Sequence, residues 1–170
     1  MTTPARTPTP IDDSLPDALR ELRTRPLLAI KLDVRGPMPV IAPPGAARRI
    51  GVVTGGSFDG ERLSGVVMDG GSDWQTLKAD DSVALDVRLV LKTDDDAFIA
   101  MTYSGVRHAA ADVMARIDRG EVVDPGNVYF RTIVRFETGA PRYDWLNRIV
   151  AIGIGHRRAD GPVYSVFEVL

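Results

Sequence analysis

Cysteine is absent from the 170-residue sequence, and histidine occurs only twice. The lack of cysteine excludes disulfide bonds, thiolate nucleophiles, iron–sulfur clusters and zinc sites built from Cys ligands. Neither His108 nor His156 has a second His or a Glu at metal-binding spacing, so we expect no metal. A chain of this length buries enough apolar surface to fold as one domain without cross-links.

Long apolar runs and blocks of one charge are also missing. No run approaches the roughly 20 residues that span a bilayer, and the first ten residues lack the apolar segment of a secretory signal. The 21 basic and 23 acidic residues are spread along the chain, with a net charge of −2. We therefore expect a cytoplasmic protein that binds neither membranes nor nucleic acid.

Two families of sequence motif are absent as well. No Gly-rich phosphate loop opens a helix, which argues against a nucleotide cofactor. No Gly-x-Ser-x-Gly element is present, and without cysteine the common covalent nucleophiles are lacking. We expect no cofactor, so any catalysis would be acid–base chemistry in a preformed pocket.

The chain divides into three parts. Residues 1–13 are rich in Thr and Pro and predict a flexible arm. Residues 14–24 predict a short amphipathic helix capped by Ser14, with an apolar stripe made by Leu15, Ala18, Leu19 and Leu22. This stripe could pack on the domain itself or join subunits of a homo-oligomer. Residues 26–170 predict a single β-domain.

Apolar residues in the β-domain recur with a period of two, and tight turns separate the segments. The turns are expected at Gly55–Gly56, Gly70–Gly71 and Asp94–Asp96. Prolines between Pro37 and Pro44 should keep any strand near Val40 short or at an edge. With a second helix ending near Gly120, the pattern predicts a mainly β fold of about eight to ten antiparallel strands and two short helices, closed as a barrel or stacked as a sandwich.

Two strands carry charge on one face. In residues 83–91 one face is apolar and the other includes Asp86 and Arg88, while in residues 128–137 the polar face holds Tyr129, Arg131, Ile133, Arg135 and Glu137. In a sandwich such faces meet bulk water, where ion pairs need no function. In a hollow barrel they could line the lumen. Periodicity does not distinguish these arrangements.

Three blocks resemble a known family. The blocks are "GVVTGGSFDGERLSGVVMDGGSDWQ", "LDVRLVLKTDDDAFIAMTYSGVRH" and "VYFRTIVRFETGAPRYDWLNRIVAIGIG", and the chain is identified by them as a member of the domain of unknown function 3237 family. The resemblance covers residues 27–170. It implies a small antiparallel β-barrel, often oligomeric, and in a few members a cofactor-independent cyclase that adds a hydroxyl across an alkene. The turn "TDDDAFI" departs from the family, which usually has a Gly there.

With a barrel as the working hypothesis, charged and aromatic residues become candidates for a site in its cavity. The candidate proton acceptors are Asp73, Asp86 and Glu137. The candidate substrate-binding residues are Trp74, Arg88, Tyr103, Arg107, His108, Tyr129, Arg131, Trp145 and Asn147, with Arg88 or Arg131 favoured as the anion binder.

Each candidate also has a structural interpretation. The charged residues could brace the barrel as ion pairs, and Asp73 could cap a turn. Trp74 and Trp145 could fill the core, and Asn147 could bond the backbone of a turn. The functional hypothesis is a cofactor-independent cyclase, isomerase or lyase acting on a small carbonyl or aromatic metabolite. A carrier barrel that binds such a molecule unchanged and a purely structural module remain as alternatives.

Overall fold

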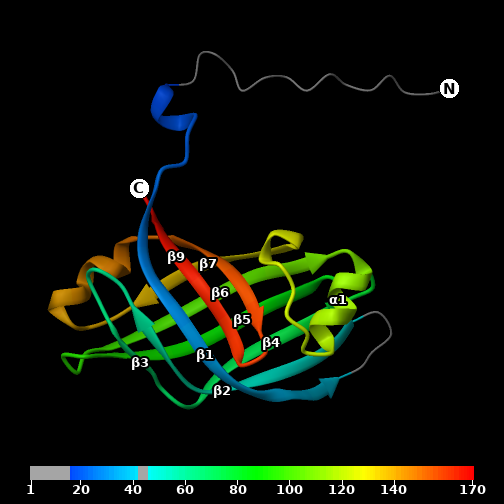
Figure 1. The fold of residues 1–170 in the computed structure, drawn as a ribbon. Coiled ribbons are helices and arrows are strands. Elements are labelled where there is room, and N and C mark those ends of the chain that lie inside the picture. Colours follow the sequence, from blue (N-terminus) through cyan, green and yellow to red (C-terminus); the bar gives the residue numbers. More distant parts are fainter. Residues whose placement is uncertain (1–15, 42–45) are drawn as a thin grey trace.

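The computed structural model describes residues 16–41 and 46–170, and within them the chain forms nine antiparallel strands (Figure 1). The strands are β1 (Thr24–Ile41), β2 (Ala46–Asp59), β3 (Gly65–Val67), β4 (Gly71–Lys78), β5 (Val83–Thr93), β6 (Phe98–Ala109), β7 (Val128–Glu137), β8 (Ala151–Arg158) and β9 (Gly161–Val169). One α-helix, α1 (Ala111–Asp118), and three 3-10 helices, η1 (Asp17–Leu19), η2 (Pro125–Asn127) and η3 (Pro141–Arg148), connect or flank them.

The strand pairings form a ring. Strand β1 pairs with β9, and the order continues through β8, β7, β6, β5, β4 and β2, which pairs back with β1. The short β3 also bridges β5 and β2. The predicted fold class, a mainly antiparallel β-barrel of eight to ten strands with short helices, is therefore confirmed. Closure removes the free sheet edges that would otherwise invite aggregation.

Alternation along the strands decides which side chains point inward. In β5 every second residue from Val83 to Thr93 is buried, whereas Asp86, Arg88 and Val90 are exposed. Strand β7 follows the same rule. The prediction that the charged faces line the lumen is wrong. Placing the apolar faces inside buries their hydrocarbon and leaves the charges hydrated, which avoids a desolvation cost of several kcal/mol per unpaired ion.

A continuous hydrophobic core fills most of the ring. It includes the fully buried Leu91, Ile99, Met101 and Leu146 together with residues from nearly every strand. A smaller apolar cluster lies under α1 and consists of Val83, Met114, Ile117 and Val123. Figure 1 shows α1 at one end of the ring and η3 at the other. The interior is thus solid except near α1.

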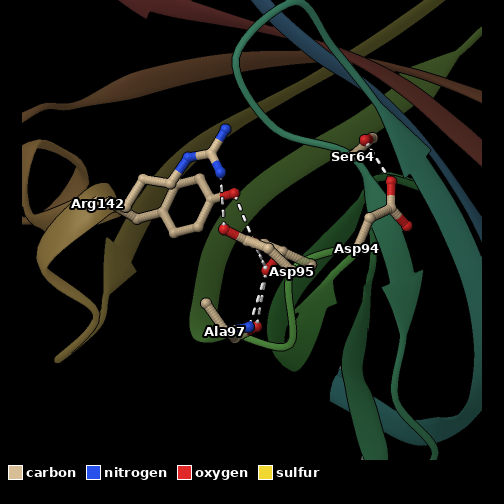
Figure 2. Close-up of polar contacts among 7 residues, drawn as sticks. Ser64, Asp94, Asp95, Ala97 and Arg142 are labelled. Atoms are coloured by element: carbon tan, nitrogen blue, oxygen red, sulfur yellow. Dashed lines mark hydrogen bonds and ion pairs between the residues drawn. The ribbon is translucent and has the colours of Figure 1, made fainter.

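The end near η3 is closed by polar contacts at the β5–β6 turn, shown in Figure 2. Asp95 accepts a hydrogen bond of 3.0 Å from Arg142 of η3, and Asp94 accepts one of 2.5 Å from Ser64. Asp96, the last of the three turn aspartates, adopts a φ of 66°. Asp tolerates this left-handed conformation better than most residues, so the turn forms without glycine.

One local prediction holds and another needs correction. Strand β1 continues through Pro37 and Pro39 to Ile41 as an edge segment, as predicted near Val40, because it pairs there with β2 alone, and the register shifts form bulges that accommodate proline. The expected turn at Gly55–Gly56 is part of β2, where a Cβ on Gly56 would lie 2.1 Å from the Lys31 carbonyl oxygen. Glycine at this position allows β2 to approach the paired strand β1 closely. The turn at Gly70–Gly71 forms as expected.

The predicted helix over residues 14–24 is much shorter in the described part of the chain. It consists of the 3-10 turn η1, which buries no residue and lies apart from the ring (Figure 1). Leu19 and Leu22 are exposed, at 68% and 65%. Ser14 and Leu15 lie outside the described residues, as does the predicted arm over residues 1–13. Three residues are too few for the i to i+4 hydrogen bonds that an amphipathic α-helix needs.

Candidate functional site

A cavity of about 130 Å³ lies at the α1 end of the ring. All eight strands of the ring and α1 contribute to its wall, which is lined by Val34, Arg35, Gly36, Pro37, Arg49, Gly51, Asp73, Gln75, Leu85, Arg107, Ile117, Asp118, Phe130, Arg157, Pro162 and Tyr164. An engineered apolar cavity of roughly 150 Å³ holds benzene. This cavity can therefore take one ring or a short acyl chain.

Asp73 is the buried carboxylate of this cavity. The alternation of β4 turns Asp73 inward, where it is only 6% exposed. Its Oδ2 accepts a hydrogen bond of 2.5 Å from Gln75 Nε2, while the buried Oδ1 has no partner among the described residues. Burial raises the pKa of Asp73, although the Gln75 hydrogen bond and the charges of nearby arginines oppose the shift. Asp73 can therefore exchange a proton closer to neutral pH than an ordinary Asp.

Arg49 orients the amide of Gln75. Its Nε donates a hydrogen bond of 2.7 Å to Gln75 Oε1. Because a guanidinium can only donate, the amide oxygen must face Arg49 and the amide nitrogen must face Asp73. The chain of contacts from Arg49 through Gln75 to Asp73 thus holds the carboxylate in one rotamer and leaves Oδ1 as the oxygen available for proton transfer.

Two buried tyrosines form the hydrogen-bond donors of the site. The Tyr103 hydroxyl donates to the Tyr164 hydroxyl across 3.2 Å, and the rings lie 5.3 Å apart. Burial raises the pKa of both phenols, and the charge of Asp73 raises both further. The tyrosines therefore stay protonated and act as donors rather than as bases.

Arg107 is the buried cation of the cavity. It is 4% exposed, its Nε has no hydrogen-bond partner in the described part of the chain, and its guanidinium lies 5.8 Å from the centroid of the Phe130 ring. Burial lowers the pKa of Arg107, and the like charge of Arg49 lowers it further. Even so, a guanidinium remains charged at neutral pH. The site therefore combines a proton acceptor, a hydrogen-bond donor and a fixed positive charge.

The structure brings together three of the predicted site residues, Asp73, Tyr103 and Arg107. Seven others lie on the outer face of the ring and do not line the cavity: Trp74, Asp86, Arg88, His108, Tyr129, Arg131 and Glu137. Asp86, Arg88 and Glu137 line a shallow outer depression instead. The inward orientation on which their assignment depended is wrong, because the opposite faces of β5 and β7 are the apolar ones.

The outer aromatic residues contact one another. The rings of His108 and Tyr129 stack at 4.9 Å, and the guanidinium of Arg131 lies 5.1 Å from the Tyr129 ring. These side chains come from the paired strands β6 and β7, where His108 is directly opposite Tyr129. Cross-strand stacking of this kind stabilises a sheet and needs no ligand.

Trp145 and Asn147 belong to η3, at the end of the ring remote from α1. Trp145 packs against the core, and the guanidinium of Arg62 lies 3.8 Å from its ring centroid while also bonding Glu168. Asn147 bonds both backbone groups of Thr138, at 2.8 and 2.9 Å. These contacts match the structural interpretation of both residues.

Most residues of the cavity wall were missed in the sequence, among them the polar Gln75, Tyr164, Arg49 and Arg157. Alternation alone indicates that Gln75 shares a face with Asp73, two residues away. Likewise, Tyr164 lies on the inward face of β9 with Val166, and Glu168 follows on the same face. The signal for these two was therefore present. Arg49 and Arg157 reach the cavity from strands whose inward faces carry no obvious apolar pattern.

Across residues 16–41 and 46–170, no three His, Asp or Glu side chains are placed to hold a metal ion. In the same residues, no helix has the length and apolarity needed to cross a bilayer.

The fold and the cavity define a small antiparallel β-barrel with an acid, an arginine and a tyrosine pair at one end. The chain belongs to the family described as Protein of unknown function (DUF3237), whose model matches residues 22–169. A UPF0311 protein of Rhodopseudomonas palustris is 38% identical over 123 residues, which are 72% of this chain and 80% of that protein.

Solved structures share the fold. A conserved protein of unknown function from Rhodopseudomonas palustris has a TM-score of 0.85 at 33% identity, covering 88% of this chain and 99% of that one. A protein of Acinetobacter baumannii described as beta-barrel like has a TM-score of 0.78 at 31% identity, covering 94% and 100%. A chain described as an enzyme from Penicillium herquei has a TM-score of 0.67 at 21% identity, covering 88% of this chain and 95% of that one. Because the identity is low, this likeness concerns the fold alone.

Proposed function

We propose that this protein is a cofactor-independent acid–base enzyme of the cyclase, isomerase or lyase type, acting on a small carbonyl or aromatic metabolite. The observation that carries the proposal is the buried Asp73 carboxylate on the wall of a ring-sized cavity, whose Oδ1 has no partner among residues 16–41 and 46–170 and whose pKa is raised. Perturbed, incompletely paired acids of this kind are concentrated at catalytic sites.

The roles follow from the donors and acceptors present. Asp73 Oδ1 removes a proton from a carbon next to a carbonyl, or from an attacking hydroxyl, and the electron pair moves onto the substrate. Tyr164, which accepts from Tyr103, donates its own proton as a hydrogen bond to the oxygen on which negative charge develops. Arg107 places a positive charge on the same wall. Asp73 then returns the proton to another substrate atom, so no co-reactant is consumed.

The Penicillium herquei chain supports the enzymatic class only as far as a shared fold can, because one fold hosts many functions. The competing function is a carrier barrel that binds a metabolite in the same cavity and releases it unchanged. A carrier needs Arg107 and the apolar wall but has no use for an acid with a raised pKa. Asp73 therefore distinguishes the two functions.

The test is catalysed hydrogen exchange. Wild-type protein is incubated in deuterium oxide with three ketones, acetophenone, phenylacetone and the keto acid levulinate, and loss of the proton signal next to the carbonyl is followed by NMR. We expect the protein to accelerate hydrogen exchange for at least one compound. In Asp73→Asn the exchange rate should fall by about 10²–10⁴-fold, which is the typical contribution of one positioned base.

Asp86→Asn is the matched control, because Asp86 is a carboxylate on the neighbouring strand β5 that faces outward. Its exchange rate should equal that of the wild type. Equal rates in Asp73→Asn and wild type would overturn the proposal. Absence of exchange for all three ketones would overturn it too and would favour the carrier.

A further inference from the structure

The cavity wall carries more positive than negative charge. Four arginines line it, from β1, β2, β6 and β8, whereas Asp73 and Asp118 are the acidic side chains on the same wall. Asp118 belongs to α1 and its side chain is 54% exposed, so water screens much of its charge. Asp73 is the buried carboxylate of the wall, and its charge is shared among Arg107, Arg49 and Arg157, so it cannot neutralise all of them.

The arginines differ in what neutralises them. Arg49 has Gln75 as a hydrogen-bond partner and lies 3.8 Å from Asp118. Arg157 donates a hydrogen bond of 3.1 Å to the backbone carbonyl of Arg158, which is a neutral acceptor. Arg107, the most buried of them, has no ion pair in the described part of the chain, and its Nε is without any acceptor.

This arrangement costs folding free energy. A buried charge without a hydrogen-bonded counter-ion destabilises a protein, and the charges of Arg49 and Arg157 add repulsion at Arg107, although the charge of Asp118 opposes this repulsion. An anion bound at Arg107 would relieve both effects. The unpaired guanidinium therefore has the properties expected of a ligand-binding group rather than of a structural brace.

The shape of the cavity limits the anion. A guanidinium matches the planar, two-oxygen geometry of a carboxylate, which it can bind through two parallel hydrogen bonds. Apolar side chains share the wall with these polar groups, among them the buried Leu85, Ile117 and Phe130. A volume of about 130 Å³ accommodates one ring or short chain beside such a group.

We infer that the molecule bound in this cavity is a small organic carboxylate, held through its carboxylate by Arg107 with Arg49 and Arg157 nearby. Its ring or acyl part packs on Phe130 and Leu85, next to Asp73. The inference rests on the proposed function for the site, and it narrows the substrate to carbonyl or aromatic acids. Arg107 is then a binding residue, and Tyr164 alone donates to the developing oxyanion.

The test compares acids with their neutral amides. Binding of benzoate and benzamide, phenylacetate and phenylacetamide, and crotonate and crotonamide is measured by titration calorimetry at neutral pH and low salt. For at least one pair we expect the acid to bind about tenfold more tightly or better, a difference of about 1.4 kcal/mol. Added salt should reduce this preference.

Arg107→Met should bind acid and amide equally, whereas Arg88→Met, which removes an outward-facing arginine of β5, should keep the preference. Arg107→Lys retains the positive charge and should keep part of the preference for acids. This variant keeps the inference testable if Arg107→Met does not fold. Equal binding of acid and amide in every pair, no binding at millimolar concentration, or a full preference in Arg107→Met would overturn the inference.

The variant Asp73→Asn separates this inference from the proposed function. Removing the Asp73 carboxylate abolishes exchange under the proposed function, but it should preserve or increase the preference for acids because one negative charge disappears. If Asp73→Asn catalyses exchange normally while the preference persists, the proposed function alone fails. If exchange depends on Asp73 and acids are not preferred, the inference alone fails.

Discussion

Tyr103 donates a hydrogen bond of 3.2 Å to Tyr164, so the Tyr164 hydroxyl oxygen is the acceptor of the pair and its proton is free for a further acceptor. Both phenols are buried, at 4% exposed each, and Tyr164 lines the cavity. A donor that is itself hydrogen-bonded as an acceptor is polarised and strengthened. The pair therefore provides one directed donor next to Asp73.

The variant Tyr164→Phe tests this donor. We expect kcat for hydrogen exchange to fall by about 10²–10³-fold, the usual effect of removing one oxyanion donor. Tyr103→Phe should cause a smaller loss, because Tyr164 then keeps its hydroxyl and loses only its polarising partner. Tyr129→Phe, on the outer face of β7, is the control and should leave kcat unchanged.

Stability is measured alongside, since Tyr164→Phe leaves the Tyr103 hydroxyl without its acceptor. Denaturant unfolding should show a loss of about 1–3 kcal/mol for a buried unsatisfied group. A variant that folds with this modest loss but exchanges at the wild-type rate would show that Tyr164 is not the donor.

The hydrogen bond from Gln75 controls when Asp73 is ionised. Burial raises the pKa of Asp73 above the ordinary value of 3.8, and the Gln75 hydrogen bond is the strongest of the effects that lower it. A base must be deprotonated, so kcat/KM should rise as pH increases through this pKa. Gln75→Leu removes the hydrogen bond, and the acid limb of the pH profile should move to higher pH.

The neighbouring arginines keep their charges in Gln75→Leu. Arg107, Arg49 and Arg157 still lower the pKa of Asp73, and the buried phenols Tyr103 and Tyr164 stay protonated across the range. The control is Trp74→Phe, because Trp74 is the adjacent residue of β4 and points outward, 44% exposed. A Gln75→Leu profile that coincides with that of Trp74→Phe would contradict the assignment of Asp73 as the base.

The strands were predictable because their alternation is local. Residues 83–91 and 128–137 are strands β5 and β7 as expected, and the Asp94–Asp96 turn forms where the sequence indicates. Alternation defines two faces but does not say which one is enclosed. Which face points inward depends on closure of the ring, which is a non-local property. The apolar faces point inward because burying the charged faces would leave ions without partners.

The site was predictable only in part, for a related reason. Asp73, Tyr103 and Arg107 have inward positions that the alternation of β4 and β6 allows, yet the same alternation allowed Asp86 and Glu137 on the assumption of a polar lumen. What makes Asp73 distinctive is its meeting with Gln75, Arg49 and Tyr164, from strands as far apart in the chain as β2 and β9. Such convergence requires the register of the whole ring.

The wall of the cavity depends on a glycine that faces Phe130. A Cβ on Gly155 would lie 2.7 Å from two atoms of the Phe130 ring, which is 1% exposed and lines the cavity. Gly155→Ala therefore forces the ring to move within a closely packed interior. We expect the free energy of unfolding, measured by denaturant titration, to fall by about 1–3 kcal/mol, the usual cost of overpacking.

Gly139→Ala is the matched control, because apart from its chain neighbours no atom of the described residues lies within 4 Å of its added Cβ, and its stability should stay near that of the wild type. Replacing Phe130 by Leu in the Gly155→Ala background makes room for the methyl group and should recover part of the lost stability. Because Phe130 also bounds the ligand space, Gly155→Ala should weaken carboxylate binding even where the protein is fully folded. Wild-type stability and affinity in Gly155→Ala would mean that the cavity wall yields freely, and a pocket of that kind could not hold a substrate in one orientation against Asp73.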